Sequence, residues 1–181
     1  LDYQTAYEDG VVNNVYRNRL ICDAAIGYVD QGKQVLIIVK KIDHGNALDT
    51  LLTASKSFLQ HTFIHGSLPT EERARAMEDF KDGIIKVLVS SSILDQGVDI
   101  PNIDVLIFGS GGSSYIKAIQ RVGRGLRINN SKTKLHVVDF SDRTNKYLAK
   151  HSVERLKAYV KEDCFNINIV DTVEELLSAN T

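Results

Sequence analysis

The sequence is short of the residues that mark several classes of protein. Its 181 residues include no tryptophan, one methionine, two prolines and two cysteines. Cys22 and Cys164 lie far apart and lack metal-type spacing, which predicts free thiols of the cytosolic kind. No apolar run approaches the roughly 18 residues of a membrane span, and the first residues lack a signal-peptide pattern. We therefore expect an intracellular, soluble protein without a membrane partner.

A strong net charge is also absent. The 22 lysines and arginines are balanced by 23 aspartates and glutamates, for a formal charge of −1. This balance gives no global attraction to polyanions, so any phosphate binding must come from local clusters. The five histidines show no metal-like clustering, so no metal site is predicted. The seven tyrosines are scattered, which argues against an aromatic platform for stacking single strands.

The chain does contain a regular alternation of two patterns. Short apolar, β-branched runs, typical of strands buried on both faces, occur at 34–39, 61–65, 84–90, 104–108 and 134–140. Helical patterns occur at 13–31, 44–59, 70–81, 113–122 and 143–162. The alternation predicts right-handed βαβ units in one α/β domain over 1–181, with a mainly parallel central sheet and helices on both faces.

Two details complete the predicted domain. Thr70 precedes two acidic residues and is expected to be the N-cap of its helix. The core is expected at about 13–162. In the extension that follows, 165–170 is expected to form one more strand before a short amphipathic tail at 172–179.

Unusual residues follow the predicted strands. Ligands of open parallel sheets bind beyond the carboxyl ends of the strands. Four of the strands are followed by KKIDHGNA, HGSL, SSSILDQGVDIP and GSGGSS, and the helix after the last of these runs into QRVGRGLR. Small, basic or hydroxyl residues at every exit are more than a purely structural domain requires, so we expect the ligand site at this edge.

QRVGRGLR, residues 120–127, is the densest of these signals. Arg121, Arg124 and Arg127 are three residues apart and would share one helical face. Gly123 and Gly125 lie among them, and two glycines this close make a regular helix unfavourable. Spacing alone is also compatible with a solvated, salt-bridged basic face.

SSSILDQGVDIP, residues 90–101, is the second signal. Its three serines can offer hydroxyls and backbone amides to a phosphate, and Gly97 permits a tight backbone path before Asp99. A serine-rich turn with a helix cap explains the same letters equally well.

The motifs taken together resemble those of a known family. SSSILDQGVDIP resembles motif V of superfamily 2 helicases, and QRVGRGLR resembles their motif VI, Q-x-x-G-R-x-x-R. QVLIIVKKIDHGNAL is similar to motif IV, and FIHGSLPTEERARAMEDFKDG to the stretch that follows it. Order and spacing match the second RecA-like domain of that superfamily over 34–140. The resemblance implies a RecA-like three-layer fold.

The resemblance also implies roles in an ATP site. Arg124 and Arg127 match the arginine fingers, which reach the γ-phosphate of ATP held by the other RecA-like domain. Gln120 and Arg121 match positions that orient the fingers or contact the nucleotide. Gly97 and Asp99, named above, match the motif V turn beside the nucleotide.

Nucleic-acid contacts are implied at the other strand exits. Ser91 falls where the family has a hydroxyl residue that contacts a nucleic-acid phosphate. Lys40, Lys41, His65 and Gly66 lie on loops that in the family face the tracked strand. For the two lysines, a solvated strand end remains an equally good interpretation.

Half of an ATPase site is absent from the sequence. There is no G-x-x-x-x-G-K-[ST] loop to hold phosphates and no Asp-Glu dipeptide for Mg²⁺. ATP and Mg²⁺ are therefore expected to be held mainly by a missing N-terminal RecA-like domain, and this chain alone is expected to be inactive. It is either a piece of a longer ATP-dependent helicase or a stand-alone domain that works with a partner. The start without methionine favours the first.

The nucleic acid is expected to be DNA. Motif VI begins with Gln120, where DEAD-box RNA helicases usually have histidine, and this resembles the DNA-directed branches that remodel forks and act in recombination and repair. An RNA helicase domain and a non-catalytic nucleic-acid-binding domain with a helicase-like fold remain alternatives. Base identity would not be read in any of these cases, because backbone contacts dominate.

Overall fold

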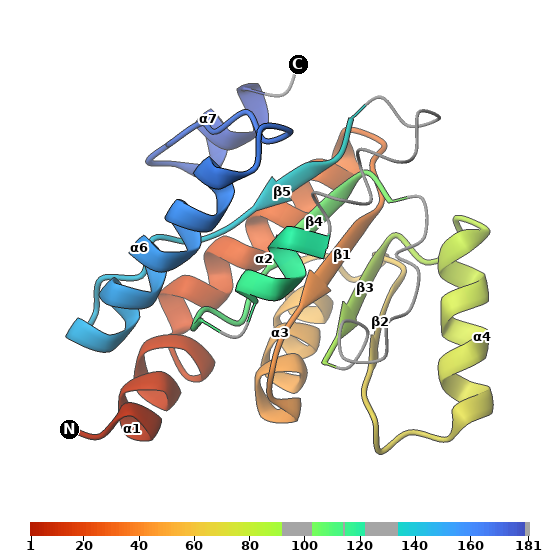
Figure 1. Ribbon diagram of the computed structural model, residues 1–181. Coiled ribbons are helices and arrows are strands. Elements are labelled where there is room, and N and C mark those ends of the chain that lie inside the picture. Colours follow the sequence, from red (N-terminus) through yellow and green to blue (C-terminus); the bar gives the residue numbers. More distant parts are fainter. Residues whose placement is uncertain (92–102, 114, 122–133, 180–181) are drawn as a thin grey trace.

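A computed structural model describes residues 1–91, 103–113, 115–121 and 134–179 of the chain. At its centre is a five-stranded sheet in the order β2-β3-β1-β4-β5, and every pairing is parallel (Figure 1). The strands are β1 (Val35–Ile38), β2 (His61–Ile64), β3 (Val87–Ser90), β4 (Val105–Phe108) and β5 (His136–Val138). The parallel α/β fold that the alternating patterns predicted is confirmed.

Helices cover both faces of this sheet. Those before and after the first strand are α1 (Tyr3–Tyr7), the π-helix η1 (Glu8–Val12), α2 (Val15–Asp30) and α3 (Ile42–Ser55). Those later in the chain are α4 (Thr70–Lys81), a helical segment at 116–121, α6 (Lys146–Lys161) and α7 (Val173–Ser178). Figure 1 shows α6 and the segment at 116–121 in front of the sheet, with α2 and α3 behind it.

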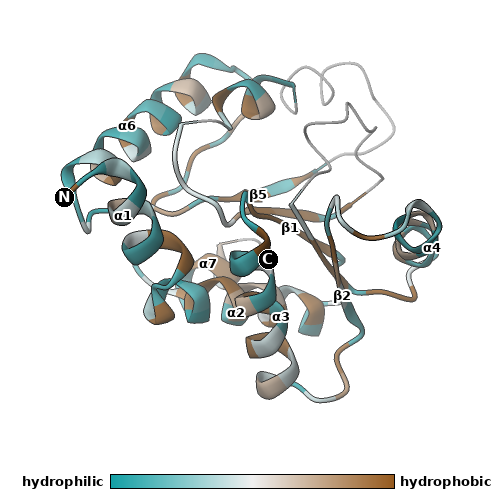
Figure 2. Cartoon of the chain, turned by 90° about the horizontal axis from the view of Figure 1, so that it is seen from below, coloured by the Kyte–Doolittle hydropathy of each residue, from teal (hydrophilic) through white to brown (hydrophobic). Residues whose placement is uncertain are grey.

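The strands contribute to two separate hydrophobic clusters because successive side chains of a strand point to opposite faces. Leu36 and Ile38 of β1 belong to the cluster beneath α4, the segment at 116–121 and α6. Val35 and Ile37 belong to the cluster beneath α2, α3 and α7. Every residue of β1, β3 and β4 is buried, as expected of strands with helices on both sides. Figure 2 shows hydrophobic sides of α2 and α3 turned toward the sheet.

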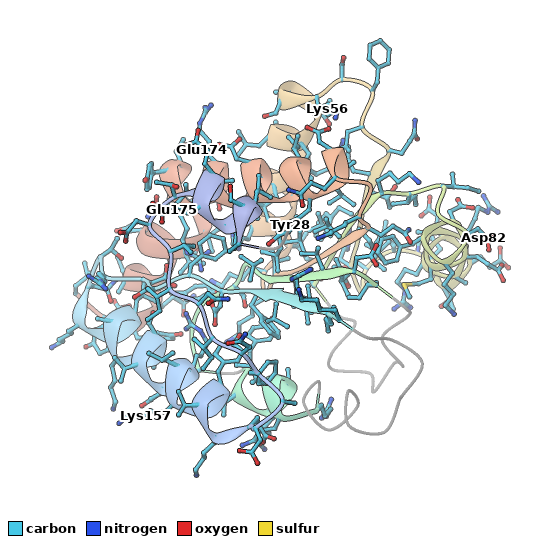
Figure 3. The ribbon with its side chains drawn as sticks, turned by 90° about the horizontal axis from the view of Figure 1, so that it is seen from above. Tyr28, Lys56, Asp82, Lys157, Glu174 and Glu175 are labelled. Carbon is cyan, nitrogen blue, oxygen red and sulfur yellow. The ribbon has the colours of Figure 1, made fainter. Side chains whose placement is uncertain are left out.

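The C-terminal extension joins the second cluster through α7. Gly27 of α2 leaves room for α7, since a Cβ atom there would come within 2.3 Å of Leu177 Cδ1. Gln31 Nε2 also donates to the Leu177 carbonyl at 3.3 Å. In Figure 3, the labelled Tyr28 of α2 lies beneath Glu174 and Glu175 of α7, on the inner side of α2.

Three expectations about local structure are wrong. Residues 165–170 form no strand; Phe165 packs edge-on against Tyr159 of α6 at 5.2 Å, and most of the segment is exposed as it leads from one face of the sheet to the other. Thr70 is the first residue of α4, and Pro69 is the N-cap. Pro69, with φ −53° and ψ 143°, makes no side-chain cap hydrogen bond.

The third error concerns the first twelve residues, which were placed outside the core. They form α1 and η1, and Tyr7, Val11 and Val12 are buried in a small cluster with Leu148 of α6. Asp2 caps α1 by accepting from the Thr5 amide at 2.9 Å. The N-terminal segment therefore connects α6 to the sheet edge where the predicted site residues lie.

Candidate functional site

The carboxyl ends of the strands form one continuous edge. Hydrogen bonds connect neighbouring exits directly: Val39 N donates to Ser90 O at 3.0 Å, Ser91 N to Ile64 O at 3.2 Å, and Gly109 N to Ile38 O at 2.8 Å. This edge therefore brings together the residues that follow β1, β2, β3 and β4, as the position of the unusual motifs predicted.

Two lysines follow β1 in different surroundings. Lys40 is exposed, whereas Lys41 is half-buried and forms an ion pair with Glu8 of η1. The Lys41 ammonium also lies 5.8 Å from the centre of the Tyr7 ring. Lys40 is thus presented to solvent, and Lys41 must leave Glu8 before it can contact a phosphate.

The residues that follow β3, and then those that follow β2, come next along the same edge. His65 is half-buried, its ring centre is 5.0 Å from that of Phe63, and its Nδ1 has no hydrogen-bond partner among the described residues. Gly66 is exposed, and a Cβ atom there would meet nothing within 4 Å. Ser91 is half-buried next to the fully buried Ser90. The structure therefore places all five predicted nucleic-acid residues on one edge.

The predicted nucleotide residues are only partly described. Gln120, which is half-buried, and Arg121, which is exposed, lie in the helical segment at 116–121. Tyr115 fixes the start of this helix to the exit of β1 by donating its hydroxyl to the Val39 carbonyl at 3.1 Å. The other four predicted residues of the nucleotide site lie outside the described residues: Gly97, Asp99, Arg124 and Arg127.

The loop after β4 reveals a feature that sequence reasoning missed. Its residues Gly109, Ser110, Gly111 and Gly112 are all buried, and the last two have φ angles of +57° and +74°. Glycine is needed where φ is positive, because other side chains are strained in that region. The two glycines of GSGGSS were the available signal for this turn.

Side chains from three helices donate to carbonyls of this loop. Arg17 of α2 donates to Gly109 O, Tyr7 Oη of α1 to Ser110 O at 2.7 Å, and Arg155 Nη1 of α6 to Gly112 O at 2.7 Å. Arg17 and Arg155 are 3% and 2% exposed, so both are true interior charges. We refer to Tyr7, Arg17 and Arg155 as the loop clamp.

Two carboxylates after β5 compensate the clamp's charges. Asp142 accepts from Arg17 through both oxygens, at 2.6 Å and 3.2 Å, and its Oδ2 is 3.6 Å from Arg155 Nη2. Asp139 Oδ2 accepts from Arg155 Nε at 2.9 Å and from the Tyr159 hydroxyl at 3.1 Å. Burial lowers the pKa of Arg155, but the two carboxylates more than offset this and raise its pKa, so the guanidinium stays charged.

Three of the scattered tyrosines meet in space. The Tyr3 ring centre lies 6.0 Å from that of Tyr7, 5.9 Å from that of Tyr147 and 5.4 Å from that of His151. The edge-on contacts with Tyr147 and His151 attach α1 to the first turns of α6. This cluster is a packing contact that sequence spacing did not indicate.

His44, at the start of α3, is another buried ionisable group near this edge. Its Nε2 lies 2.7 Å from Asn18 Oδ1, and Nδ1 has no partner among the described residues. Burial, together with the positive charge of Arg17, lowers the pKa of His44 to about 3, so the ring is neutral near pH 7.

The described part of the chain contains neither a metal-type cluster nor a membrane-spanning helix. No three histidine, cysteine, aspartate or glutamate side chains in 1–91, 103–113, 115–121 and 134–179 are grouped to hold a metal ion. In the same part of the chain, no helix is both long and apolar enough to cross a membrane.

Comparison with known proteins decides the family. Residues 17–129 match the helicase conserved C-terminal domain. The chain belongs to this helicase family. The match covers the edge described above and the motifs on both sides of it, so the resemblance to the second RecA-like domain of superfamily 2 helicases is confirmed.

The relatives that resemble this chain include proteins named as DNA helicases and proteins named as RNA helicases. The ATP-dependent DNA helicase uvsW of Enterobacteria phage T4 is 26% identical over 163 residues, which are 81% of this chain and 32% of that protein. The pre-mRNA-splicing ATP-dependent RNA helicase PRP28 of Debaryomyces hansenii is 33% identical over 87 residues, which are 48% of this chain and 15% of that protein. The chain thus spans a third or less of the length of these two relatives.

The fold has a solved counterpart. The crystal structure of T4 UvsW superposes with a TM-score of 0.70 and 24% identity, over 90% of this chain and 35% of that one. At this identity the likeness shows the fold alone.

Proposed function

We propose that this chain is the C-terminal motor domain of an ATP-dependent DNA helicase or translocase. It works with an N-terminal RecA-like domain, proposed to lie in the same protein, that carries the phosphate-binding loop and the Mg²⁺ ligands this sequence lacks. The observation that carries the proposal is the single edge on which Lys40, His65, Gly66 and Ser91 meet, within a helicase-family domain.

The proposed nucleic-acid contacts follow from the chemistry of this edge. Lys40 offers an exposed ammonium, Ser91 a hydroxyl, and Gly66 a backbone that another molecule can approach closely. Such groups bind phosphates without reading bases, as a motor that moves along any sequence requires. Lys41 is a weaker candidate, because Glu8 competes for its charge.

The proposed contribution to ATP hydrolysis is electrostatic. Arg124 and Arg127 follow the helix that carries Gln120 and Arg121, and we assign them as fingers for an ATP bound to the other domain. Bound there with Mg²⁺, ATP supplies the phosphoryl group that is transferred. A guanidinium stays protonated and stabilises charge that develops on phosphate oxygens in the transition state.

The test is ATP hydrolysis by the complete motor, meaning this chain joined to its N-terminal RecA-like domain. We expect strong stimulation by single-stranded or forked DNA, weaker stimulation by RNA of the same length, and almost no hydrolysis by residues 1–181 alone. Absence of stimulation by either nucleic acid would refute the motor assignment. The second candidate, an RNA motor, is favoured by the similarity to the RNA helicase PRP28, and stronger stimulation by RNA would establish it.

A further inference from the structure

The loop clamp holds backbone that leads directly into the proposed ATP-site helix. After Gly112, Ser113 O accepts from Ile116 N at 3.2 Å, and the helical segment at 116–121 begins. Gln120 and Arg121 lie at the far end of that helix. The position of the loop therefore bears on where this helix begins, and with it on where Gln120 and Arg121 lie.

The loop is poorly placed to fix its own position. Two of its four residues are glycines with positive φ, which lack side chains to pack. The Ser110 hydroxyl is buried and has no partner among the described residues. Among the described residues, the loop carbonyls accept side-chain hydrogen bonds from α1, α2 and α6, which are remote in sequence.

Burying the charged groups of the loop clamp carries a desolvation penalty. Removing two guanidinium groups and two carboxylates from water costs several kcal/mol per ion, and apolar side chains of similar volume often stabilise a fold equally well. A buried guanidinium differs from an apolar side chain because it donates several hydrogen bonds in fixed directions. Arg155 uses three nitrogens at once, toward Gly112 O, Asp139 and Phe140 O, at 2.7 Å, 2.9 Å and 2.9 Å.

We propose that Arg17, Tyr7 and Arg155 are positioning residues for ATP turnover, acting through the carbonyls of Gly109, Ser110 and Gly112. They hold the loop, and with it the helix at 116–121, in the geometry that transition-state stabilisation requires. The inference rests on the proposed motor function. It adds that residues of α1, α2 and α6, outside the motifs, determine the rate of the chemical step.

The decisive variant is Arg155→Lys in the complete motor. Lysine keeps the positive charge beside Asp139 but cannot donate in three fixed directions. We expect kcat at saturating DNA to fall on the order of 10-fold or more, because small misplacements of catalytic groups lower the rate of the chemical step strongly. The KM for ATP should change by less than about 3-fold, since the clamp acts on geometry used only in the transition state.

A matched control is Lys157→Ala on the same helix. Lys157 is exposed on the outer side of α6 (Figure 3), whereas Arg155 is buried against the loop. This variant should retain the parental kcat. Amide hydrogen exchange of residues 109–113 gives a readout separate from activity, and it should accelerate in Arg155→Lys but not in Lys157→Ala.

The outcomes separate the two proposals. If the parent is active and Arg155→Lys has the same kcat, measured well below the melting temperature of the variant, the positioning role of the loop clamp is refuted. The motor assignment is then unaffected. A parent without nucleic-acid-stimulated hydrolysis overturns both. If Arg155→Lys fails to fold, Tyr7→Phe decides, since it removes only the hydroxyl bonded to Ser110 O. A several-fold lower kcat in Tyr7→Phe supports the clamp, and an unchanged kcat refutes it.

Discussion

Replacement of His44 by glutamine should remove a large part of the acid sensitivity of this domain. His44 is fully buried, and its imidazole is neutral in the folded state because burial lowers its pKa from 6.5 to about 3. In the unfolded chain the ring takes up a proton near its ordinary pKa. As pH falls below 6.5 the unfolded state therefore gains a proton that the folded state does not accept until about pH 3.

The magnitude follows from these two pKa values. Between these two pKa values each pH unit removes up to about 1.4 kcal/mol from the free energy of unfolding. Because the loss begins only near the unfolded pKa of 6.5, it amounts to roughly 2 kcal/mol at pH 5 compared with pH 7. Glutamine can still donate to Asn18 Oδ1, which is 2.7 Å from His44 Nε2, but it has no second proton to gain. The His44→Gln protein should thus lose roughly 2 kcal/mol less than the parent over this range.

Urea unfolding of residues 1–181, followed by circular dichroism at pH 7, 6 and 5, measures the effect. Leu48→Met is the control, because Leu48 is buried on the same helix and does not titrate. Its free energy of unfolding should differ from that of the parent by the same amount at each pH. If the free energies of unfolding of the parent and of His44→Gln also differ by a constant amount from pH 7 to pH 5, the conclusion that His44 is buried in its neutral form is refuted.

The remaining predictions concern function. Residues 1–181 alone should hydrolyse almost no ATP, and appreciable turnover by the pure chain would contradict the shared-site proposal. In the complete motor, Arg124→Ala or Arg127→Ala should lower ATPase turnover on the order of 10³-fold while nucleotide affinity stays nearly intact; parental turnover would make QRVGRGLR a solvated basic turn. Ser91→Ala should reduce DNA stimulation more than ATP affinity, and the reverse pattern would place Ser91 on the nucleotide side. Lys40→Ala should lower the slope of log affinity against log salt by about 1, measured by DNA titration, whereas an unchanged slope would exclude a phosphate contact.

Local sequence pattern was sufficient to predict the sheet and the edge on which the candidate site residues lie. The strands β1, β3 and β4 were visible as short β-branched runs because strands covered on both faces must be apolar throughout. The edge was visible because a parallel register aligns all carboxyl ends, so that residues such as Lys40, His65 and Ser91 had to meet once the strands were placed. These conclusions needed only neighbours in sequence and one rule of topology.

Pairing and burial could not be obtained from the same patterns. The alternation in 165–170 is compatible with a strand, but a strand requires a partner, and this segment packs Phe165 against Tyr159 instead. The sequence did not predict the ion pair between Lys41 and Glu8, because the helix that contains Glu8 was not predicted. In each case the missing information is which distant segment lies alongside.

The sequence by itself determined the parallel α/β fold, the helicase motifs and their order, because each is written in residues that are close together in the chain. Only the tertiary structure decided that Tyr7, Arg17 and Arg155 converge on the loop after β4. Their acceptors are backbone carbonyls. Every residue has such a carbonyl, so the residue type does not show which one will accept a hydrogen bond. A guanidinium in the sequence predicts a surface charge, and it becomes an interior donor only when folding brings Asp139 and Asp142 beside it.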